Sequence, residues 1–283
     1  MTGINDMRRR TLLRAAFYAA STLLVAFWLI PLILAFTTSV KSMDEIMGAG
    51  AMWAFPKDWR FDNFAKVWTS VGMGRYVLNT IIITTPSVAG TLLISSLAAF
   101  ALAFYQFRLN KVVLIMFIAG MLIPFQMLMI PVFRLSDNLG LMNTWPGVII
   151  FHIAFQLGFC TFFLRNFMRQ IPFSLIEAPR IDGASDFRIY WQIILPLAKS
   201  SMAALAVLEF TWIWNDLLWS LVLLQSDALK PVTLGLANMQ GEFVSYYNMT
   251  AAGSIIAMAI PLGFFLLFQR YFVKGMAVGA VKG

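Results

Sequence analysis

Charged residues are scarce in this sequence. Of its 283 residues, only 12% are Asp, Glu, Lys or Arg, whereas 60% are apolar. Soluble domains carry roughly 25% charged residues. This chain has too few polar groups to cover its apolar side chains in water. An ordinary soluble domain is therefore excluded, and lipid is the expected solvent for much of the chain.

Cysteine and histidine are almost absent. Cys160 and His152 are single copies, so one chain builds neither a disulfide nor a thiolate zinc site. We expect Cys160 to be a small packing residue. The sequence also lacks a GxxxxGK[ST] nucleotide-binding run, a serine–histidine pair and metal-spaced acids with assignable roles. These absences predict a chain with no catalytic residue, no metal site, no bound cofactor and no enzymatic activity of its own.

Six charge-poor stretches are each long enough to cross a hydrocarbon core of about 30 Å. Only the fifth contains charged residues, Glu209 and Asp216. Backbone amides in lipid have to be satisfied within the segment, so spans of this length are expected to be helices. The sequence therefore predicts an all-α integral membrane protein with six transmembrane helices, at 15–40, 76–107, 112–133, 138–164, 200–226 and 243–269.

Lys and Arg are unevenly distributed between the connections. With the N-terminus on the cytoplasmic side, fourteen of them fall on that side and seven on the other. Cytoplasmic loops carry an excess of Lys and Arg, so both termini are predicted to be cytoplasmic. This topology accounts for the net charge of +8. No basic run alternates with aromatic residues, so nucleic acid is not an expected partner.

Two connections are longer than the others. The extracytoplasmic loop 41–75 carries Gly and Pro turn signals and is too short to form a separate domain. The cytoplasmic loop 165–199 contains helix signals. The predicted organisation is a cytoplasmic N-terminus over 1–14, a six-helix transmembrane domain over 15–273 and a cytoplasmic tail over 274–283.

The cytoplasmic loop 165–199 contains the start and stop signals of two short helices. Ser174 stands three residues before Glu177, the spacing of a capping box. Gly183 suits the left-handed turn that ends a helix, and Ser185 is placed to cap a second helix that runs to a kink at Pro196. Two interpretations remain open from this pattern. The element either lies on the lipid headgroups or docks on a protein partner.

The run EAPRIDGASDFRIYWQIILP, residues 177–196, resembles the EAA loop of ABC importer permeases. That pattern reads Glu-Ala-Ala, three residues, Gly, nine residues, Ile-x-Leu-Pro. Four residues fall at the required spacings: Gly183, Ile193, Leu195 and Pro196. Pro179 replaces the second Ala. Proline is tolerated in the first turns of a helix, so we expect this helix to survive with altered contacts.

The resemblance extends over nearly the whole chain. It is closest to the carbohydrate-type permeases related to the smaller membrane subunit of the maltose importer. Further short matches are YVLNT at 76–80, WIWND at 212–216 and GAVKG at 279–283. The resemblance implies a type I ABC importer fold in the inner membrane of a bacterial or archaeal cell. It also implies alternating access that moves a sugar or sugar derivative into the cytoplasm.

The resemblance implies several partners besides the lipid bilayer. They are a second, homologous permease subunit, two ATP-binding subunits that hold ATP and Mg, and a soluble substrate-binding protein. The EAA loop of the family forms a coupling helix that docks on an ATP-binding subunit, and the matching positions are Glu177, Ala178, Pro179, Asp182, Gly183 and Ala184. The terminal residues Gly279, Lys282 and Gly283 resemble a tail that reaches the ATPase pair in some relatives; a terminus without that contact is the alternative.

Polar residues inside the spans are candidates for a substrate pathway: Asn79, His152, Glu209, Trp212, Asn215 and Asp216. Acids at bilayer depth are costly, so they usually face a polar pathway or a partner. Glu209 and Asp216 are seven residues apart, which predicts that they share one face of the fifth helix. Trp212 and Asn215 near that face suit a sugar ring. Interhelical hydrogen bonds, and simple packing for His152, are the alternatives.

A second function stays open from the residues alone. In an ion-coupled secondary transporter, Glu209 and Asp216 would be proton or cation sites. Uptake would then collapse when the ion gradient is dissipated and survive inactivation of an ATPase.

Overall fold

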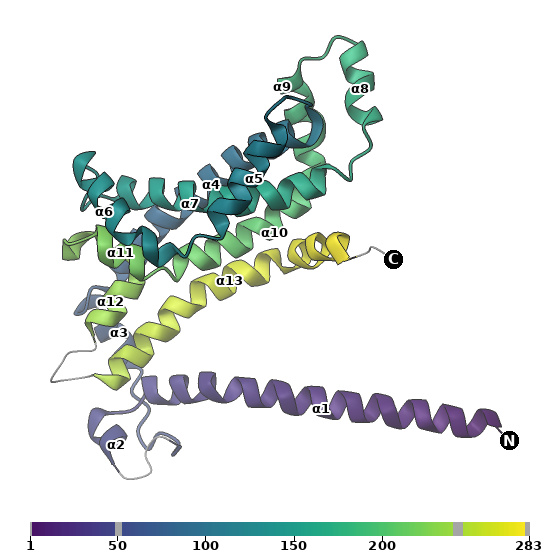
Figure 1. Cartoon of the computed structure of the whole chain (residues 1–283). Helices are drawn as coiled ribbons and strands as arrows, with labels where there is room; N and C mark the ends of the chain where they lie inside the picture. Colours follow the sequence, from purple (N-terminus) through teal and green to yellow (C-terminus); the bar gives the residue numbers. More distant parts are fainter. Residues whose placement is uncertain (1, 49–52, 240–245, 281–283) are drawn as a thin grey trace. The chain divides into compact units, whose positions relative to one another are not determined.

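The computed structural model describes residues 2–48, 53–239 and 246–280, and the regular elements in these ranges are helices (Figure 1). Their bounds are α1 Thr2–Ser39, α2 Met43–Met47, α3 Asp62–Thr69, α4 Met73–Phe104, α5 Asn110–Met121, η1 Phe125–Leu128, α6 Met129–Asn138, α7 Trp145–Met168, α8 Ser174–Ile181, α9 Asp186–Ile189, a π-helical turn Tyr190–Ile194, α10 Leu195–Trp214, α11 Leu218–Leu223, η3 Asp227–Leu229, α12 Val232–Asn238 and α13 Tyr247–Ala280.

The described helices agree with the predicted all-α membrane class. Five are long and apolar enough to cross a membrane: 10–39 in α1, α4, α7, the run 186–214 that ends in α10, and 247–270 in α13. A sixth candidate is the pair formed by α5 and the η1–α6 helix, which is bent by 94°. The count of six spans is reached when this bent pair is one span.

The predicted third and fourth spans were wrong in their boundaries. The chain breaks between Met121 and Phe125, because Pro124 lacks an amide hydrogen and disfavours helical backbone in the residue before it. Helix then resumes and reaches Asn138. The fourth span begins only at Trp145, where the hydroxyl of Thr144 accepts a hydrogen bond from the amide of Gly147 at 3.2 Å. The predicted start at residue 138 is therefore the end of α6.

The fifth span was also misplaced. Residues 200–226 were expected to form it, but α10 starts at Leu195 and ends at Trp214, and a separate helix, α11, follows. The predicted kink at Pro196 takes the form of a π-helical turn directly before it, in which the amide of Leu195 donates to the carbonyl of Tyr190. Proline has no amide to continue the regular ladder, and a π turn is one way to accommodate that loss.

By its contacts the chain divides into two compact units, one of residues 1–72 and 238–256 and one of residues 73–237 and 257–283. In the first unit, the loop after α1 is held by buried amides. The side-chain nitrogen of Asn63 donates to the carbonyls of Ser39 at 2.8 Å and Lys41 at 3.0 Å, and that of Asn248 donates to Lys41 at 3.3 Å. The described parts of the predicted extracytoplasmic loop thus contain α2 and α3.

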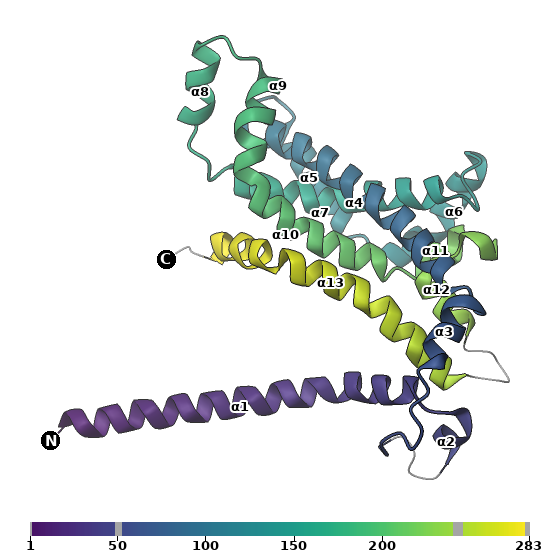
Figure 2. The ribbon, with the colours of Figure 1, turned by 180° about the vertical axis from the view of Figure 1, so that it is seen from behind.

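The second unit is built on α4, α7 and α10, which lie side by side when seen from the front and from behind (Figures 1 and 2). Helix α4 faces its neighbours with small hydroxyl residues that are fully buried: Thr84, Ser87, Thr91, Ser95 and Ser96. Small residues let membrane helices approach closely, where lipid gives no hydrophobic drive to association. The hydroxyl groups of Ser96 and Tyr190 hydrogen-bond at 2.7 Å, which ties α4 to the π turn.

Gly158 marks a close crossing of α7 and α5. A methyl group at its Cα would lie 2.9 Å from the carbonyl oxygen of Phe117 and 3.1 Å from Cγ of Met121. We expect Gly158→Ala to destabilise the second unit by roughly 1–3 kcal/mol, because the two backbones have to move apart. The measurement is thermal unfolding in detergent. Gly120→Ala is the matched control, since its added methyl meets nothing within 4 Å; equal effects of the two substitutions would show that the crossing is not tight.

Candidate functional site

Helices α8 and α9 form a hairpin at one end of the second unit, beyond the ends of α4 and α7 (Figure 1). Ile176 anchors α8. Its side chain is fully buried in a cluster that includes Leu164, Met168, Ile189 and Tyr190. The opposite surface is exposed and partly apolar, with Ile181 81% exposed and Phe187 68% exposed. The hairpin is therefore fixed to the helix core on one side and offers apolar groups on the other.

The turn between α8 and α9 depends on Gly183. Its φ is +80°, a conformation that costs side-chain-bearing residues energy. The amide of Ala184 donates to the carbonyl of Pro179, and that of Gly183 to the carbonyl of Arg180. These two bonds form a Schellman motif, which ends α8 as predicted. The hydroxyl of Ser185 accepts from the amide of Arg188 and caps α9, also as predicted.

The predicted start of α8 was wrong in its detail. Ser174 is already helical, Phe173 before it has helical backbone, and no side-chain cap bond is made. The amides of Ile176 and Glu177 both donate to the carbonyl of Phe173. Ser174 thus does not occupy the N-cap position that a capping box requires. Pro179 lies within α8 and the helix survives, as expected.

A charged clamp closes the hairpin. The Nε and Nη2 atoms of Arg180 donate to one carboxylate oxygen of Asp186, at 3.0 and 2.8 Å. The guanidinium carbon also lies 5.0 Å from the ring centre of Tyr105, a cation–π distance. The hydrogen bond with Asp186 raises the pKa of Arg180 above its ordinary value. Sequence reasoning did not identify this clamp, because the six-residue spacing becomes a contact only through the Gly183 turn.

The six predicted coupling residues lie together on this hairpin. Glu177, Ala178, Asp182 and Gly183 are exposed, and Pro179 and Ala184 are half-buried. Pro179, Asp182 and Ala184 line a hollow of about 220 Å³ between α8 and α9. The arrangement is a short, braced element with an accessible tip, suited to contact with another protein.

The second candidate site lies where α10 gives way to α11. Asp216 follows the end of α10, so the prediction that it shares a helix face with Glu209 was wrong. Its carboxylate accepts hydrogen bonds from the amides of Trp219 at 3.2 Å and Ser220 at 3.0 Å, and from the Ser220 hydroxyl at 2.9 Å. The Nε2 atom of His152 on α7 is 3.7 Å from the same carboxylate. The structure thus brings together two of the predicted pathway residues.

Glu209 occupies a separate, closed environment. It is fully buried, and the Sγ atom of Cys160 on α7 donates to its Oε1 atom at 3.1 Å. Its Oε2 atom has no hydrogen-bond partner within the described residues. This geometry supports the interhelical alternative for Glu209. It also gives Cys160 a polar contact in addition to the expected packing role.

The remaining pathway candidates differ in exposure. Trp212 is 46% exposed, and its ring is tilted against that of Phe159 with the ring centres 5.2 Å apart. Asn215 is exposed at the end of α10. Asn79 is instead buried, and its side-chain nitrogen donates to the carbonyls of Ala228 and Lys230, at 2.9 Å each. This supports an interhelical role for Asn79. Trp212 and Asn215 keep surfaces that a ligand can reach.

The predicted ATPase-contacting tail is only partly described. Gly279 belongs to α13, which continues to Ala280 beyond the predicted end of the last span. Lys282 and Gly283 lie outside the described residues.

Comparison with known proteins identifies the family. The model of the binding-protein-dependent transport system inner membrane component matches residues 90–278. The osmoprotective compounds uptake permease protein GgtD of Synechocystis is 35% identical over 267 residues, which cover 92% of this chain and 90% of that protein. The melibiose/raffinose/stachyose import permease protein MelC of Bacillus subtilis is 34% identical, over 90% of this chain and 91% of its own.

A solved structure gives the same answer for the fold. A chain of a bacterial ABC transporter involved in the import of the acidic polysaccharide alginate superposes with a TM-score of 0.77 at 27% identity, over 92% of this chain and 97% of that one. The family match includes the α8–α9 hairpin and the α10–α11 junction. These comparisons give no support to the ion-coupled secondary transporter. The chain therefore belongs to the binding-protein-dependent transport family and is a multi-pass inner-membrane permease of an ABC importer.

Proposed function

We propose that this permease carries a carbohydrate into the cytoplasm as one of two homologous membrane subunits. Two ATPase subunits supply ATP and Mg chemistry, and a soluble binding protein delivers the substrate. Carbohydrates are named for several relatives: melibiose, raffinose and stachyose for MelC, arabinooligosaccharides for AraQ of Halalkalibacterium halodurans, which is 34% identical, and alginate for the solved importer. These names support the substrate class and leave the particular sugar open.

The α8–α9 hairpin is the observation that carries this proposal. It projects an apolar tip at Ile181 from a base fixed by the fully buried Ile176. An exposed apolar group flanked by charges suits a protein groove. We therefore propose that Glu177, Ala178, Pro179, Asp182, Gly183 and Ala184 contact an ATPase subunit. A tail contact through Gly279, Lys282 and Gly283 belongs to the same proposal.

Rigid bracing explains how docking would drive transport. The hairpin is joined to the helix core by Ile176, by the Arg180–Tyr105 contact, and by the continuous backbone from α9 through the π turn into α10. A displacement of its tip is then transmitted to the core helices as rigid-body motion, the basis of alternating access. At the far end of α10, Trp212 and Asn215 are the residues that we propose for substrate contact.

The test is uptake by the complete importer in proteoliposomes. We expect uptake of the sugar bound by the co-purified binding protein to require ATP hydrolysis. Inactivation of the ATPase subunits should abolish uptake, and ionophores that dissipate ion gradients should leave it unchanged. Uptake that survives ATPase inactivation and collapses with the ion gradient would restore the secondary-transporter alternative.

A further inference from the structure

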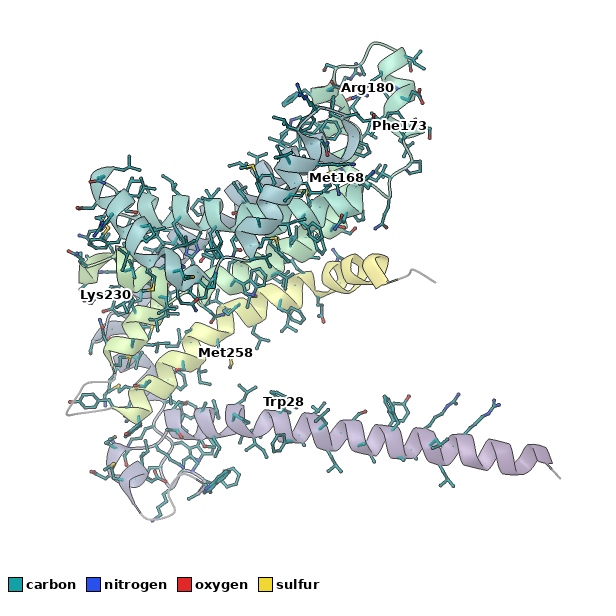
Figure 3. All side chains as sticks on the ribbon, in the orientation of Figure 1. Trp28, Met168, Phe173, Arg180, Lys230 and Met258 are labelled. Carbon is teal, nitrogen blue, oxygen red and sulfur yellow. The ribbon has the colours of Figure 1, made fainter. Side chains whose placement is uncertain are left out.

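A polar cavity of about 920 Å³ lies where α4 and α7 end, below the α8–α9 hairpin. Its walls come from the last turn of α4, the connection into α5, the end of α7 and the segment 169–173. Figure 3 labels Met168 and Phe173, which mark this end of α7. The cavity belongs entirely to the second unit, and the coupling and pathway proposals do not use it.

The part of the chain that the structure describes contributes four cations and no carboxylate to the lining of this cavity: Arg108, Lys111, Arg165 and Arg169. Among the described residues, none of the four takes part in an ion pair. Arg165 and Arg169 are one helical turn apart, where like charges repel. The cavity therefore concentrates positive charge that the described side chains do not neutralise.

The helix dipoles account for only part of this charge. Arg165 and Arg169 are at the C-terminal end of α7, where a cation is favourable. Arg108 and Lys111 flank the start of α5, where the dipole is positive and a cation is unfavourable. The amide of Asn110, the first residue of α5, already donates to the carbonyl of Phe107. An anion in the cavity would offset the unfavourable positive charge of Arg108 and Lys111 at this helix end.

One of the cations is already positioned by the backbone. The Nε atom of Arg165 donates to the carbonyl of Leu102 at 3.3 Å. The side chain of Asn110 donates to the carbonyls of Leu102 and Tyr105, at 3.3 and 2.8 Å. These bonds fold the α4–α5 connection back over the end of α4, so the walls of the cavity are fixed before any ligand arrives.

Apolar side chains also line the cavity, beside the uncharged polar groups of Gln106, Asn110 and Gln170. Leu102, Phe104, Phe107, Ile171 and Phe173 line the same cavity, and Phe107 and Phe173 are 43% and 51% exposed. A free phosphate ion would leave these groups without a contact. An amphiphile with an anionic head and a hydrocarbon chain would use both kinds of wall. The cavity is at the ends of α4 and α7, two helices long and apolar enough to cross a membrane, so we expect lipid headgroups at this level.

We propose that this cavity binds an anionic phospholipid, with its phosphate among Arg108, Lys111 and Arg169 and its hydrocarbon against Phe107 and Phe173. The site is on the side predicted to be cytoplasmic, where basic pockets between helices bind anionic headgroups. Bound lipid links the start of α5 to the segment that leads into α8. The lipid thereby supports the base of the hairpin.

Native mass spectrometry of the full chain in detergent tests this site with added phosphatidylglycerol. The triple variant Arg108→Gln/Lys111→Gln/Arg169→Gln is expected to bind that lipid at least about tenfold more weakly, since each cation near a lipid phosphate adds several-fold to affinity. Arg165 is kept because of its bond to Leu102. Phosphatidylcholine, whose headgroup has no net charge, should bind weakly to both proteins.

A matched control removes the same charge elsewhere. Arg10→Gln/Arg14→Gln/Lys199→Gln neutralises three exposed cations on the same predicted side but outside the cavity, and it should bind phosphatidylglycerol as the unaltered chain does. Equal lipid affinity of the two triple variants would overturn the proposal. Displacement of the lipid by inorganic phosphate would assign the cavity to a free anion, and displacement by added ATPase subunits would assign it to a protein; either result also overturns it.

Discussion

Gly183→Trp is expected to abolish ATP-driven uptake while the chain still folds and inserts. The φ of +80° at Gly183 strains any residue with a Cβ by about 1–2 kcal/mol. Within the described chain, however, the added Cβ meets nothing within 4 Å. The side chain therefore leaves the backbone into open space, and its indole would extend from the exposed turn toward any protein that covers it. We expect at least about a hundredfold loss of uptake, as for a side chain forced into the centre of an interface.

Gly183→Ala isolates the backbone effect. Alanine bears the same φ strain as tryptophan but adds only a methyl group, so we expect it to reduce uptake a few-fold. The difference between the two variants measures contact with a partner. Co-purification of the ATPase subunits should fail for the tryptophan variant and persist for alanine. Equal uptake by both variants would mean that no protein receives the hairpin, and the headgroup-lying alternative would then stand.

The hairpin was the most predictable part of the structure. Its turn follows from local rules, because Gly183 alone supplies the positive φ and Ser185 alone supplies the cap. The Arg180–Asp186 bridge was not predictable in the same way. It requires both helices to be placed, and sequence spacing does not show which charges meet across a turn. The turn and the cap of α9 were thus predictable from short-range chemistry, whereas the start of α8 and the contacts that brace the hairpin were not.

The membrane helices were predicted in kind but not in extent. Hydropathy reports burial in lipid, and an irregular segment that packs against protein is as apolar as a helix. The break before Phe125 and the end of α10 at Trp214 therefore fall inside apolar runs. Pro124 gave a signal for the first break. The signal for the end of α10 was Asp216, which accepts hydrogen bonds from amides at the start of α11. The predicted fifth span had included this residue.

Asp216→Ala is expected to unfold the α10–α11 junction at lower temperature. The carboxylate satisfies two amides and one hydroxyl at the start of α11, and it faces His152 on α7. Loss of a helix cap costs about 1 kcal/mol, and each buried group left without a partner costs about 1–3 kcal/mol more. We expect a destabilisation of about 3 kcal/mol, measured by thermal unfolding in detergent, and a loss of uptake that follows the loss of folded protein.

Asp216→Asn and Asn215→Ala separate a structural role from substrate contact. The Asp216→Asn side chain retains an oxygen that accepts from one amide. The unfolding temperature of this variant should therefore lie between those of the unaltered chain and Asp216→Ala. The side chain of Asn215 is exposed and donates to the carbonyl of Thr211, one turn earlier in the chain. Asn215→Ala should therefore leave stability unchanged, and it should raise the KM for uptake if this residue touches the sugar. An Asp216→Asn chain that unfolds at the unaltered temperature but loses sugar affinity would show that the carboxylate serves the substrate rather than the helix junction.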